Sequence, residues 1–290
     1  MDPGPQAAGH DPVAVTGAGH VLGTPCDPAP YLRVRKNRKF MGAQDDLAVA
    51  AAGRALESAG RGGQALGGRA GLYMAVGYIP FEREHTDLLL HRSIDPDGRV
   101  SMARFSTDAF GALNPLLTFR CLSNMPAFHV SVNFDLQGPY FVTYPGSGQL
   151  YLALEEAVTA LRAREVDVAL LCGVAHQRNA LVEHHFARLE PPVPAEQLVD
   201  AAGCLVLERA ADAGGRARGR LVGLAVTYEP WHPFEEVRIP EEGAFGADLP
   251  EGTLGAASLP VLVSLGLGGA LRHELSTRDG LRASSAWGPP

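Results

Sequence analysis

The sequence predicts an α/β layered fold, because short buried strands alternate with amphipathic helices along the chain. The clearest unit runs from Leu136 to Gly173 and has the pattern of a strand, a glycine-rich turn, a helix and a second strand. The second strand, residues 166–171, has the composition of a strand buried on both faces. No linker separates two domains, so we expect one domain over residues 13–290 behind a disordered tail, residues 1–12.

Length and composition limit the possible functions. The chain has 290 residues, of which 46% are hydrophobic and 20% charged, enough for one large core or two small ones. The formal charge of −7 argues against a nucleic-acid-binding protein. One local basic run, residues 33–39, is interpreted as a solvated surface segment, with a docking site as the alternative.

Cysteine spacing and hydropathy indicate the cellular compartment in which the protein is expected. The four cysteines show no CxxC spacing and follow no signal-peptide pattern, so we expect reduced thiols in a cytoplasmic protein. No apolar run reaches the length of a membrane span, because the longest candidate, residues 254–271, contains serines, a proline and glycines. We therefore expect neither a nucleic acid nor a membrane as partner.

The first elements are a strand at residues 12–17 and a helix at residues 42–60, whose small apolar residues fall on one face. Between them, Gly17, Gly19 and Gly23 resemble a relaxed dinucleotide fingerprint. The spacing is GxGxxxG and no helix pattern follows, so we favour a tight turn over a nicotinamide or flavin site.

The middle of the chain is less regular. A strand is predicted at residues 71–76, followed by an irregular charged excursion at residues 81–112. His85 and His91 in this excursion lack partners at metal-ligand spacing, so we expect no metal site. Residues 114–134 have the pattern of one buried helix that opens at an Asn-Pro pair.

The turn in the central unit carries the candidate nucleophile. A strand at residues 141–144 ends at Pro145-Gly146, and a helical apolar stripe follows from Leu150. Ser147 is therefore expected at the mouth of a helix, where α/β enzymes often carry a nucleophile. Further strands are expected at residues 201–207 and 220–226.

Six segments in the same order resemble the β-ketoacyl synthases of the thiolase fold. They are residues 13–23, 39–60, 123–139, 165–177, 201–210 and 253–273. The resemblance covers most of the chain and implies a thiolase-like layered α/β/α fold in shortened form. It places the N-terminal half at residues 13–210 and a reduced C-terminal half at residues 211–290.

The chain departs from that family at the positions that carry its chemistry. Aligned without gaps from Gly138 to Asp167, the sequence has Ser147 where the family has its nucleophilic cysteine. The family's histidine before the LGAA block falls on Gly252, and its other histidine lies in a stretch mostly missing between residues 229 and 250. A serine hydroxyl without an adjacent base is a poor nucleophile, and each lost proton-transfer or oxyanion group costs ~10²- to 10⁴-fold in rate. The resemblance therefore implies no catalytic residue in this chain.

Inactive relatives with these departures exist in the family. The chain resembles the chain length factors of type II polyketide synthases, in a reduced form similar to those of polyene-type, highly reducing pathways. This implies a non-catalytic subunit that pairs with a catalytic ketosynthase and encloses the tunnel of the growing acyl chain. The resemblance implies no cofactor of its own, because the acyl-phosphopantetheine belongs to a partner acyl carrier protein.

The resemblance also implies a tunnel gate on the helix before Asn124. There Leu113, Leu116, Leu117 and Arg120 recur at helical spacing. Plain core packing is the alternative for the leucines. An arginine on an apolar helix face is seldom buried alone, so we expect Arg120 to have a partner.

Two other functional classes remain open. In the first, Ser147 is the nucleophile of an acyltransferase or esterase, although the turn lacks the complete GxSxG and the sequence marks no His/Asp pair. The histidines that could serve as its base are His129, His176, His184 and His185. In the second, the chain is a small-molecule or dinucleotide-binding module, which the weak glycine pattern disfavours.

Overall fold

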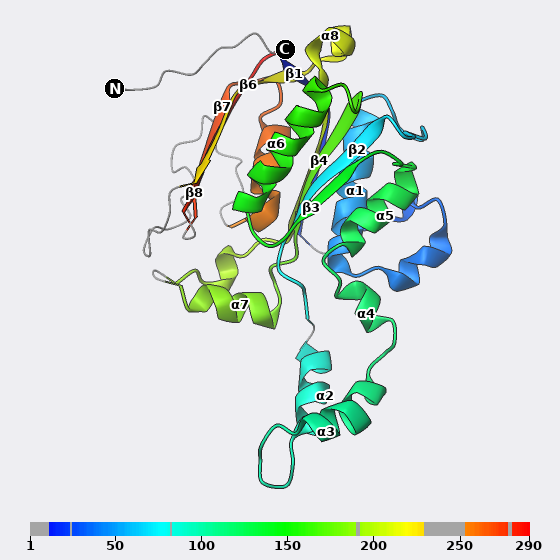
Figure 1. The fold of residues 1–290 in the computed structure, drawn as a ribbon, viewed down its shortest axis with the longest axis vertical. Helices are drawn as coiled ribbons and strands as arrows, with labels where there is room; N and C mark the ends of the chain where they lie inside the picture. The colour runs from blue at the N-terminus through cyan, green and yellow to red at the C-terminus, as the bar shows by residue number, and fades with distance from the viewer. Residues whose placement is uncertain (1–11, 24, 82, 190–191, 229–252, 278–279) are drawn as a thin grey trace.

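The computed structural model describes residues 12–23, 25–81, 83–189, 192–228, 253–277 and 280–290. Their strands form one mixed eight-stranded sheet in the order β3-β2-β4-β5-β1-β6-β8-β7 (Figure 1). The strands are β1 (Val13–Leu22), β2 (Ala70–Val76), β3 (Tyr140–Thr143), β4 (Val168–Ala175), β5 (Ala201–Arg209), β6 (Gly219–Tyr228), β7 (Leu271–Ser276) and β8 (Leu281–Gly288). β2 is parallel to β3 and β4, and the other neighbours are antiparallel.

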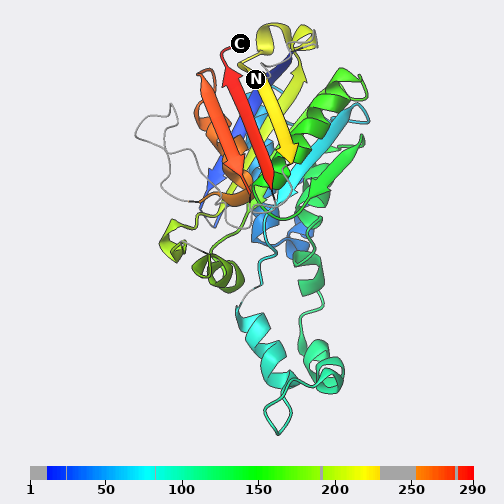
Figure 2. The same cartoon turned by 60° about the vertical axis from the view of Figure 1, so that its left-hand side comes forward.

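Helices cover the sheet in layers. One apolar core lies between the sheet and the layer formed by α1 (Ala43–Ser58) and α5 (Met125–Phe134). On the other face, α6 (Gly148–Arg162) and α9 (Ser258–Leu265) lie between the main sheet and the outer strands β6, β8 and β7 (Figure 2). The layered α/β prediction is confirmed, and α6 is buried between two surfaces of one curved sheet.

The central unit has the predicted order of elements. β3, α6 and β4 follow one another as strand, helix and strand, with a turn that contains Pro145 and Gly146. The helix predicted at residues 42–60 is α1, which Gly42 caps and which Gly60 ends with a positive φ of 70°. Strong periodicity bounded by glycine and proline made these elements predictable.

The glycine segment after the first strand is not a turn. β1 continues to Leu22, so the prediction of a tight turn is wrong. Cβ atoms at Gly17 and Gly19 would collide with the backbone of α1 at Ala55. These glycines therefore let α1 lie against β1. The Pro12 carbonyl also accepts a hydrogen bond from the Ala210 amide at 2.8 Å, so Pro12, predicted in the tail, belongs to the fold; residues 1–11 are outside the described part.

The excursion predicted as irregular is largely helical. Residues 83–122, which we call the arm, project from the body of the molecule (Figure 1). Its elements are α2 (Arg83–Ser93), α3 (Met102–Arg104), a π-helix (Phe105–Ala109), a 3₁₀ helix (Phe110–Ala112) and α4 (Leu117–Arg120). The single helix predicted at residues 114–134 is therefore two helices, α4 and α5. Pro126 explains the break, because proline fits the first turn of a helix but not its interior.

Short helices complete the described chain. They are α7 (Ala180–Ala187) and α8 (Ala210–Ala213), with 3₁₀ turns at Ala29–Tyr31, Arg35–Phe40, Ala195–Gln197, Gly214–Arg216 and Gly255–Ala257. None of the described helices is long and apolar enough to cross a membrane.

Candidate functional site

The carboxyl ends of β2, β3 and β4 meet at one edge of the sheet, because these strands are parallel. In α/β folds this edge is the usual place for a binding or catalytic site. Tyr78 follows β2, Ser147 follows β3 and His176 follows β4. The sequence-predicted nucleophile therefore lies at the expected edge.

Ser147 is the N-cap of α6 and is half-buried. Gly146 before it has a φ of 101°, a left-handed conformation that glycine adopts without strain. The Thr143 hydroxyl lies 3.2 Å from the Met74 carbonyl and 3.1 Å from the Gln149 carbonyl, which ties the turn to β2. Among the described residues, no group is hydrogen-bonded to the Ser147 hydroxyl. Within the described part of the chain, the turn therefore presents a serine without a bonded base.

His176 belongs to the opposite face of the sheet. In β4, Leu171 packs in the core around α6, whereas Cys172 and Val174 pack in the core under α1. Side chains alternate along a strand, so His176 continues the α1 face. Its Nδ1 lies 3.5 Å from Oδ1 of the buried Asp200. His176 and Asp200 are therefore close but not hydrogen-bonded, and by this alternation the histidine side chain lies on the α1 face.

Asp200 has a structural role at this end of the sheet. Its Oδ1 accepts hydrogen bonds from the backbone amides of Gln177 at 2.7 Å and Arg178 at 2.9 Å. Two backbone donors stabilise the carboxylate and fix the turn between β4 and α7. The pair with His176 is part of this turn.

An aromatic cluster joins α7 to the strand ends. The Tyr78 hydroxyl lies 3.2 Å from Nε2 of His185, and the Tyr78 ring contacts that of Tyr144 edge-on at 6.4 Å. Burial, helped by Tyr144, raises the pKa of the Tyr78 hydroxyl. Tyr78 is therefore neutral at physiological pH and acts as a hydrogen-bonding partner of His185.

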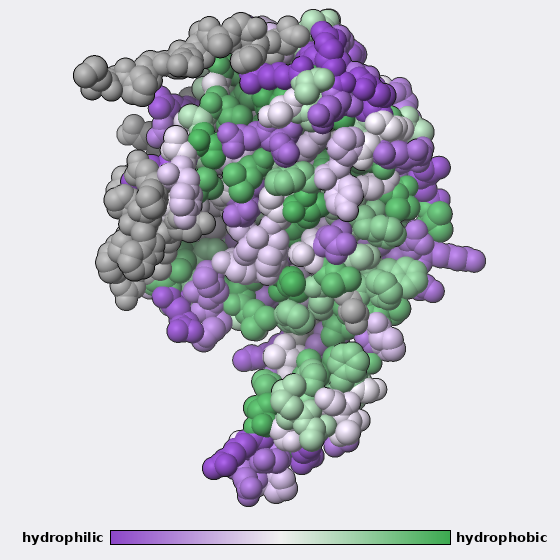
Figure 3. All heavy atoms as spheres, in the orientation of Figure 1, coloured by the Kyte–Doolittle hydropathy of each residue, from purple (hydrophilic) through white to green (hydrophobic). Residues whose placement is uncertain are grey.

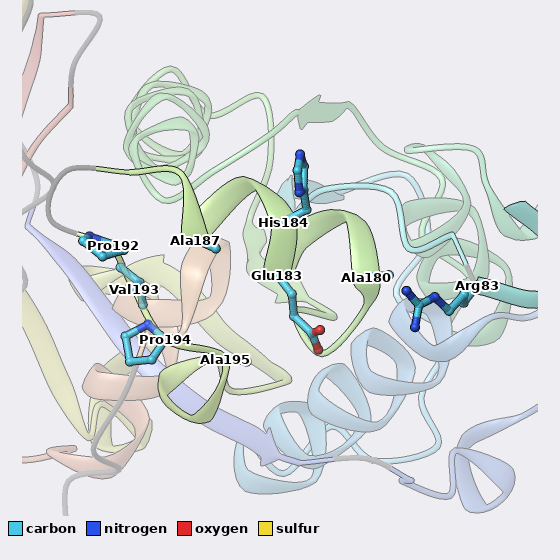
Figure 4. Close-up of a pocket in the computed structure, with 9 residues that line it drawn as sticks. All are labelled: Arg83, Ala180, Glu183, His184, Ala187, Pro192, Val193, Pro194 and Ala195. Atoms are coloured by element: carbon cyan, nitrogen blue, oxygen red, sulfur yellow. The ribbon is translucent and has the colours of Figure 1, made fainter. Parts of the chain in front are cut away.

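The remaining two histidines lie elsewhere. His129 is 1% exposed on α5, and neither of its ring nitrogens has a hydrogen-bond partner in the described structure. Burial lowers the pKa of His129 to about 4. His184 lines an open cavity of about 680 Å³ between α7, residues 192–195 and Arg83 at the start of α2 (Figure 4). Glu183 lies across this cavity from Arg83, while small apolar residues form the rest of its lining.

The predicted histidine position, Gly252, lies just outside the described residues. Its neighbour Thr253 is described and is held by two backbone hydrogen bonds. The Thr253 amide donates to the Gln197 carbonyl at 2.7 Å, and the Val199 amide donates to the Thr253 carbonyl at 3.1 Å. The Gln177 side-chain amide also donates to the Thr253 carbonyl. The chain next to position 252 is therefore fixed at the end of β4.

A buried polar network begins one turn into α6, and no local sequence pattern indicates it. The Tyr151 hydroxyl lies 2.7 Å from His273 Nδ1, 2.9 Å from the His273 carbonyl and 3.1 Å from Ser285 Oγ. The Trp287 indole donates to the same Ser285 hydroxyl at 2.9 Å. Burial lowers the pKa of His273 to about 4. This network fastens α6 to the outer strands β7 and β8.

The four predicted gate residues do not share one helix. α4 begins at Leu117, so Leu113 and Leu116 precede it, and the prediction of helical spacing for these two is wrong. Leu117 is buried, whereas Leu113 and Leu116 are half-buried. Arg120 has the expected partner, because its Nη2 donates to the Lys39 carbonyl at 3.1 Å, and its charge also acts on Asp45.

The basic run is an exposed surface with ion pairs at both ends. Arg38 contacts Asp27 at 3.0 Å and Asp46 at 2.9 Å, and Arg33 lies 3.6 Å from Asp135. Pairs of this kind at an exposed site contribute little to stability. The structure is compatible with a solvated segment and with a docking site.

Exposed apolar side chains occur on the edge strand β3, on α5 and on the arm. β3 is an edge strand, and its Tyr140 is 74% exposed. Figure 3 shows apolar residues gathered along the arm and around its junction with the body. We call the following set the apolar interface patch: Val100, Met102, Phe110, Phe119, Leu122, Phe128 and Tyr140.

No cluster of metal-ligating side chains occurs among the residues that the structure describes. No dinucleotide site is formed by the glycines of β1, because their α-carbons face the backbone of α1. The absence of cofactors from this chain stays a prediction.

Comparison with known proteins identifies the relatives of this chain. A sequence profile described as the β-ketoacyl synthase N-terminal domain matches residues 16–198. Among curated proteins, none has a sequence that matches.

Several solved structures have the same fold. A type II polyketide synthase acyl carrier protein in complex with its ketosynthase, AntDE:AntF, superposes with a TM-score of 0.70 at 11% identity. The ishigamide ketosynthase/chain length factor gives 0.68 at 16%, and a β-ketoacyl synthase from Burkholderia phymatum gives 0.66 at 15%. Each match covers 97% of this chain and 100% of the other.

Proposed function

Because the chain belongs to the β-ketoacyl synthase family, we propose that it is a non-catalytic chain length factor, which pairs with a catalytic ketosynthase and shapes the acyl tunnel. The observation that carries the proposal is Ser147, which the gap-free alignment sets against the family's nucleophilic cysteine and which has no hydrogen-bonded base in the described structure. A serine in that state is un-ionised at neutral pH and does not attack a thioester at a useful rate.

The arrangement of the histidines supports the same conclusion. The His176–Asp200 pair belongs to the face under α1, and His273 is bonded to Tyr151 in the core. Neither pair is disposed to take a proton from Ser147. Among the described residues, the esterase and acyltransferase alternative therefore has a candidate nucleophile without a bonded base.

The surface supports a partner subunit. An unpaired edge strand offers backbone donors and acceptors to another chain, and the residues of the apolar interface patch lie on this strand, on α5 and on the arm. Apolar areas of this kind on a folded chain mark protein interfaces. The ishigamide ketosynthase/chain length factor and the AntDE:AntF complex are structures of such assemblies, and their fold is that of this chain.

The partners follow from this role. A catalytic ketosynthase supplies the thiolate and histidines, and an acyl carrier protein presents the acyl chain on its phosphopantetheine. In the proposed pair, the arm of this chain contacts the ketosynthase, and Leu113, Leu116, Leu117 and Arg120 lie at the root of that arm. Bulky residues at a tunnel end limit the chain, since each extra methylene must displace packed atoms at a cost of ~1–3 kcal/mol.

Co-expression with a full-length ketosynthase encoded beside this chain tests the proposal. We expect an equimolar complex by size-exclusion chromatography with light scattering, and self-association of this chain when it is alone. Tyr140→Asp together with Phe128→Asp places charges on the patch and should abolish the complex. Arg220→Asp, an exposed change on the outer strand β6 and away from the arm, is the matched control. A stable monomer that does not bind the ketosynthase would overturn the proposal.

A further inference from the structure

Two thiols face each other in the middle of the main sheet. Cys172 in β4 and Cys204 in β5 are register partners, and their Sγ atoms are 2.9 Å apart. Both cysteines are free and buried in the core under α1. We propose that Cys172 and Cys204 are a modification site, at which a small peroxide forms an internal disulfide across β4 and β5.

The backbone already has the geometry that a disulfide needs. Opposed residues in an antiparallel pair have Cα atoms about 4.5–5.5 Å apart. Disulfides span Cα separations of about 4.4–6.8 Å. The strands therefore need no rearrangement, and only the two side chains move.

The burial of the two thiols limits which oxidants can reach them. Burial, together with the neighbouring Cys172 thiol, raises the pKa of Cys204 well above its usual range. Thiolate is scarce at such a site, and a bulky disulfide such as oxidised glutathione does not reach it. A small neutral oxidant, hydrogen peroxide, is the class that fits a closed core.

The reaction balances with peroxide alone. One thiolate attacks a peroxide oxygen and displaces hydroxide, which takes up the proton of that thiol and leaves as water; the product is a sulfenic acid. The second thiol then attacks the sulfenic sulfur, the S–S bond forms and a second water leaves. The two sulfurs together lose two electrons, and the peroxide gains them.

The bond would close a loop of the chain that contains α7. Residues 173–203 lie between the two cysteines and contain α7, the His176–Asp200 turn and the cavity of Figure 4. A disulfide at the base of this segment removes conformational freedom from the unfolded chain. Oxidation should therefore raise the thermal stability of the whole sheet.

The experiment treats the folded full-length chain with hydrogen peroxide and blocks remaining thiols with iodoacetamide. Non-reducing peptide mapping should show one cross-linked pair that contains Cys172 and Cys204, lost on addition of dithiothreitol. Cys26 and Cys121 should remain as separately alkylated peptides. The melting temperature should rise by several degrees in the oxidised protein.

Matched variants make the outcome decisive. Cys172→Ala and Cys204→Ala should each lose both the cross-link and the thermal shift, whereas Cys26→Ala should keep both. The inference is overturned if Cys26 is fully oxidised while Cys172 and Cys204 stay free, or if they pair only with other cysteines. It is also overturned if the bond forms only in denatured protein. None of these outcomes depends on the proposed chain length function.

Discussion

The hydroxyl of Tyr151 lies 2.7 Å from Nδ1 of His273, and this contact fastens the helix behind Ser147 to an outer strand. Both side chains are buried, and the residues are far apart in the sequence. A buried polar contact of this length holds two layers in one relative position, because leaving either partner unpaired costs free energy.

Removal of this hydroxyl should destabilise the fold. Tyr151→Phe keeps the ring but leaves the buried His273 Nδ1 without its hydroxyl partner, so we expect a loss of about 1–3 kcal/mol in the free energy of unfolding. Urea unfolding followed by circular dichroism measures it. Tyr140→Phe, at an exposed position, is the matched control and should change little. Equal stability of the two variants would show that the network contributes nothing.

Stability should fall as pH rises through neutrality, because of Asp45. Burial raises the pKa of this carboxyl to about 7, whereas the unfolded value is 3.8. The folded state therefore binds more protons than the unfolded state between these two pKa values. The contribution of protonated Asp45 to the free energy of unfolding is present at low pH and is lost as pH rises through 7, at about 1.4 kcal/mol per pH unit at most. Asp46, whose pKa burial raises to about 6, acts with the same sign.

The variant Asp45→Asn isolates this effect. Its amide oxygen can still accept from the Gly42 amide, which lies 2.7 Å from the carboxylate, and it carries no charge at any pH. We expect its unfolding free energy to exceed that of the wild type increasingly from pH 6 to pH 8, measured by urea unfolding. The exposed Asp87→Asn is the control. A constant difference across this range would contradict the shift.

Replacement of Ser147 should leave the proposed complex active. Ser147→Ala removes the hydroxyl, and since no base is bonded to it, we expect product formation by the reconstituted pair to stay within a factor of two or three of wild type. The wild-type chain should also resist a fluorophosphonate probe. Labelling of Ser147, or a loss of ~10²-fold or more with the complex intact, would favour the acyltransferase alternative.

Product length should respond to Leu116 more than to Leu117. Leu116 is half-buried before α4, so Leu116→Ala should admit longer chains at an unchanged condensation rate. Leu117 is buried, so Leu117→Ala should instead cost ~2–5 kcal/mol of stability. Mass spectrometry of carrier-bound products checks the first expectation and thermal unfolding the second. Identical product distributions for wild type and Leu116→Ala would place the gate elsewhere.

The sequence predicted the elements whose signals are local. α1 and α6 have periodic apolar patterns, β4 is a continuous apolar run, and each lies within a few residues of its prediction. The glycines of β1 were misinterpreted because their reason is tertiary: α1 occupies the space of the missing side chains. The arm was missed because its helices are short and the longest of them, α2, is mostly polar, so no long apolar stripe marks it.

The candidate site was predictable to the same extent. Ser147 was placed correctly at the start of α6, since a turn between strand and helix is a local feature. The sheet face on which each histidine lies could not be predicted, because the face of His176 depends on the residue at which β4 begins. The Tyr151–His273 contact joins distant parts of the chain, which no local pattern reveals.

The position of β1 in the sheet has a consequence for biosynthesis. β1 leaves the ribosome first, yet its long neighbour is β5, with Val13 opposite Arg209. At ~5–20 residues per second, the intervening chain takes roughly 10–40 s to be made. During that interval the nascent first strand has no partner, and its apolar face is available to chaperones or to aggregation. The pairing of β1 in this sheet therefore has to wait until β5 has been synthesised.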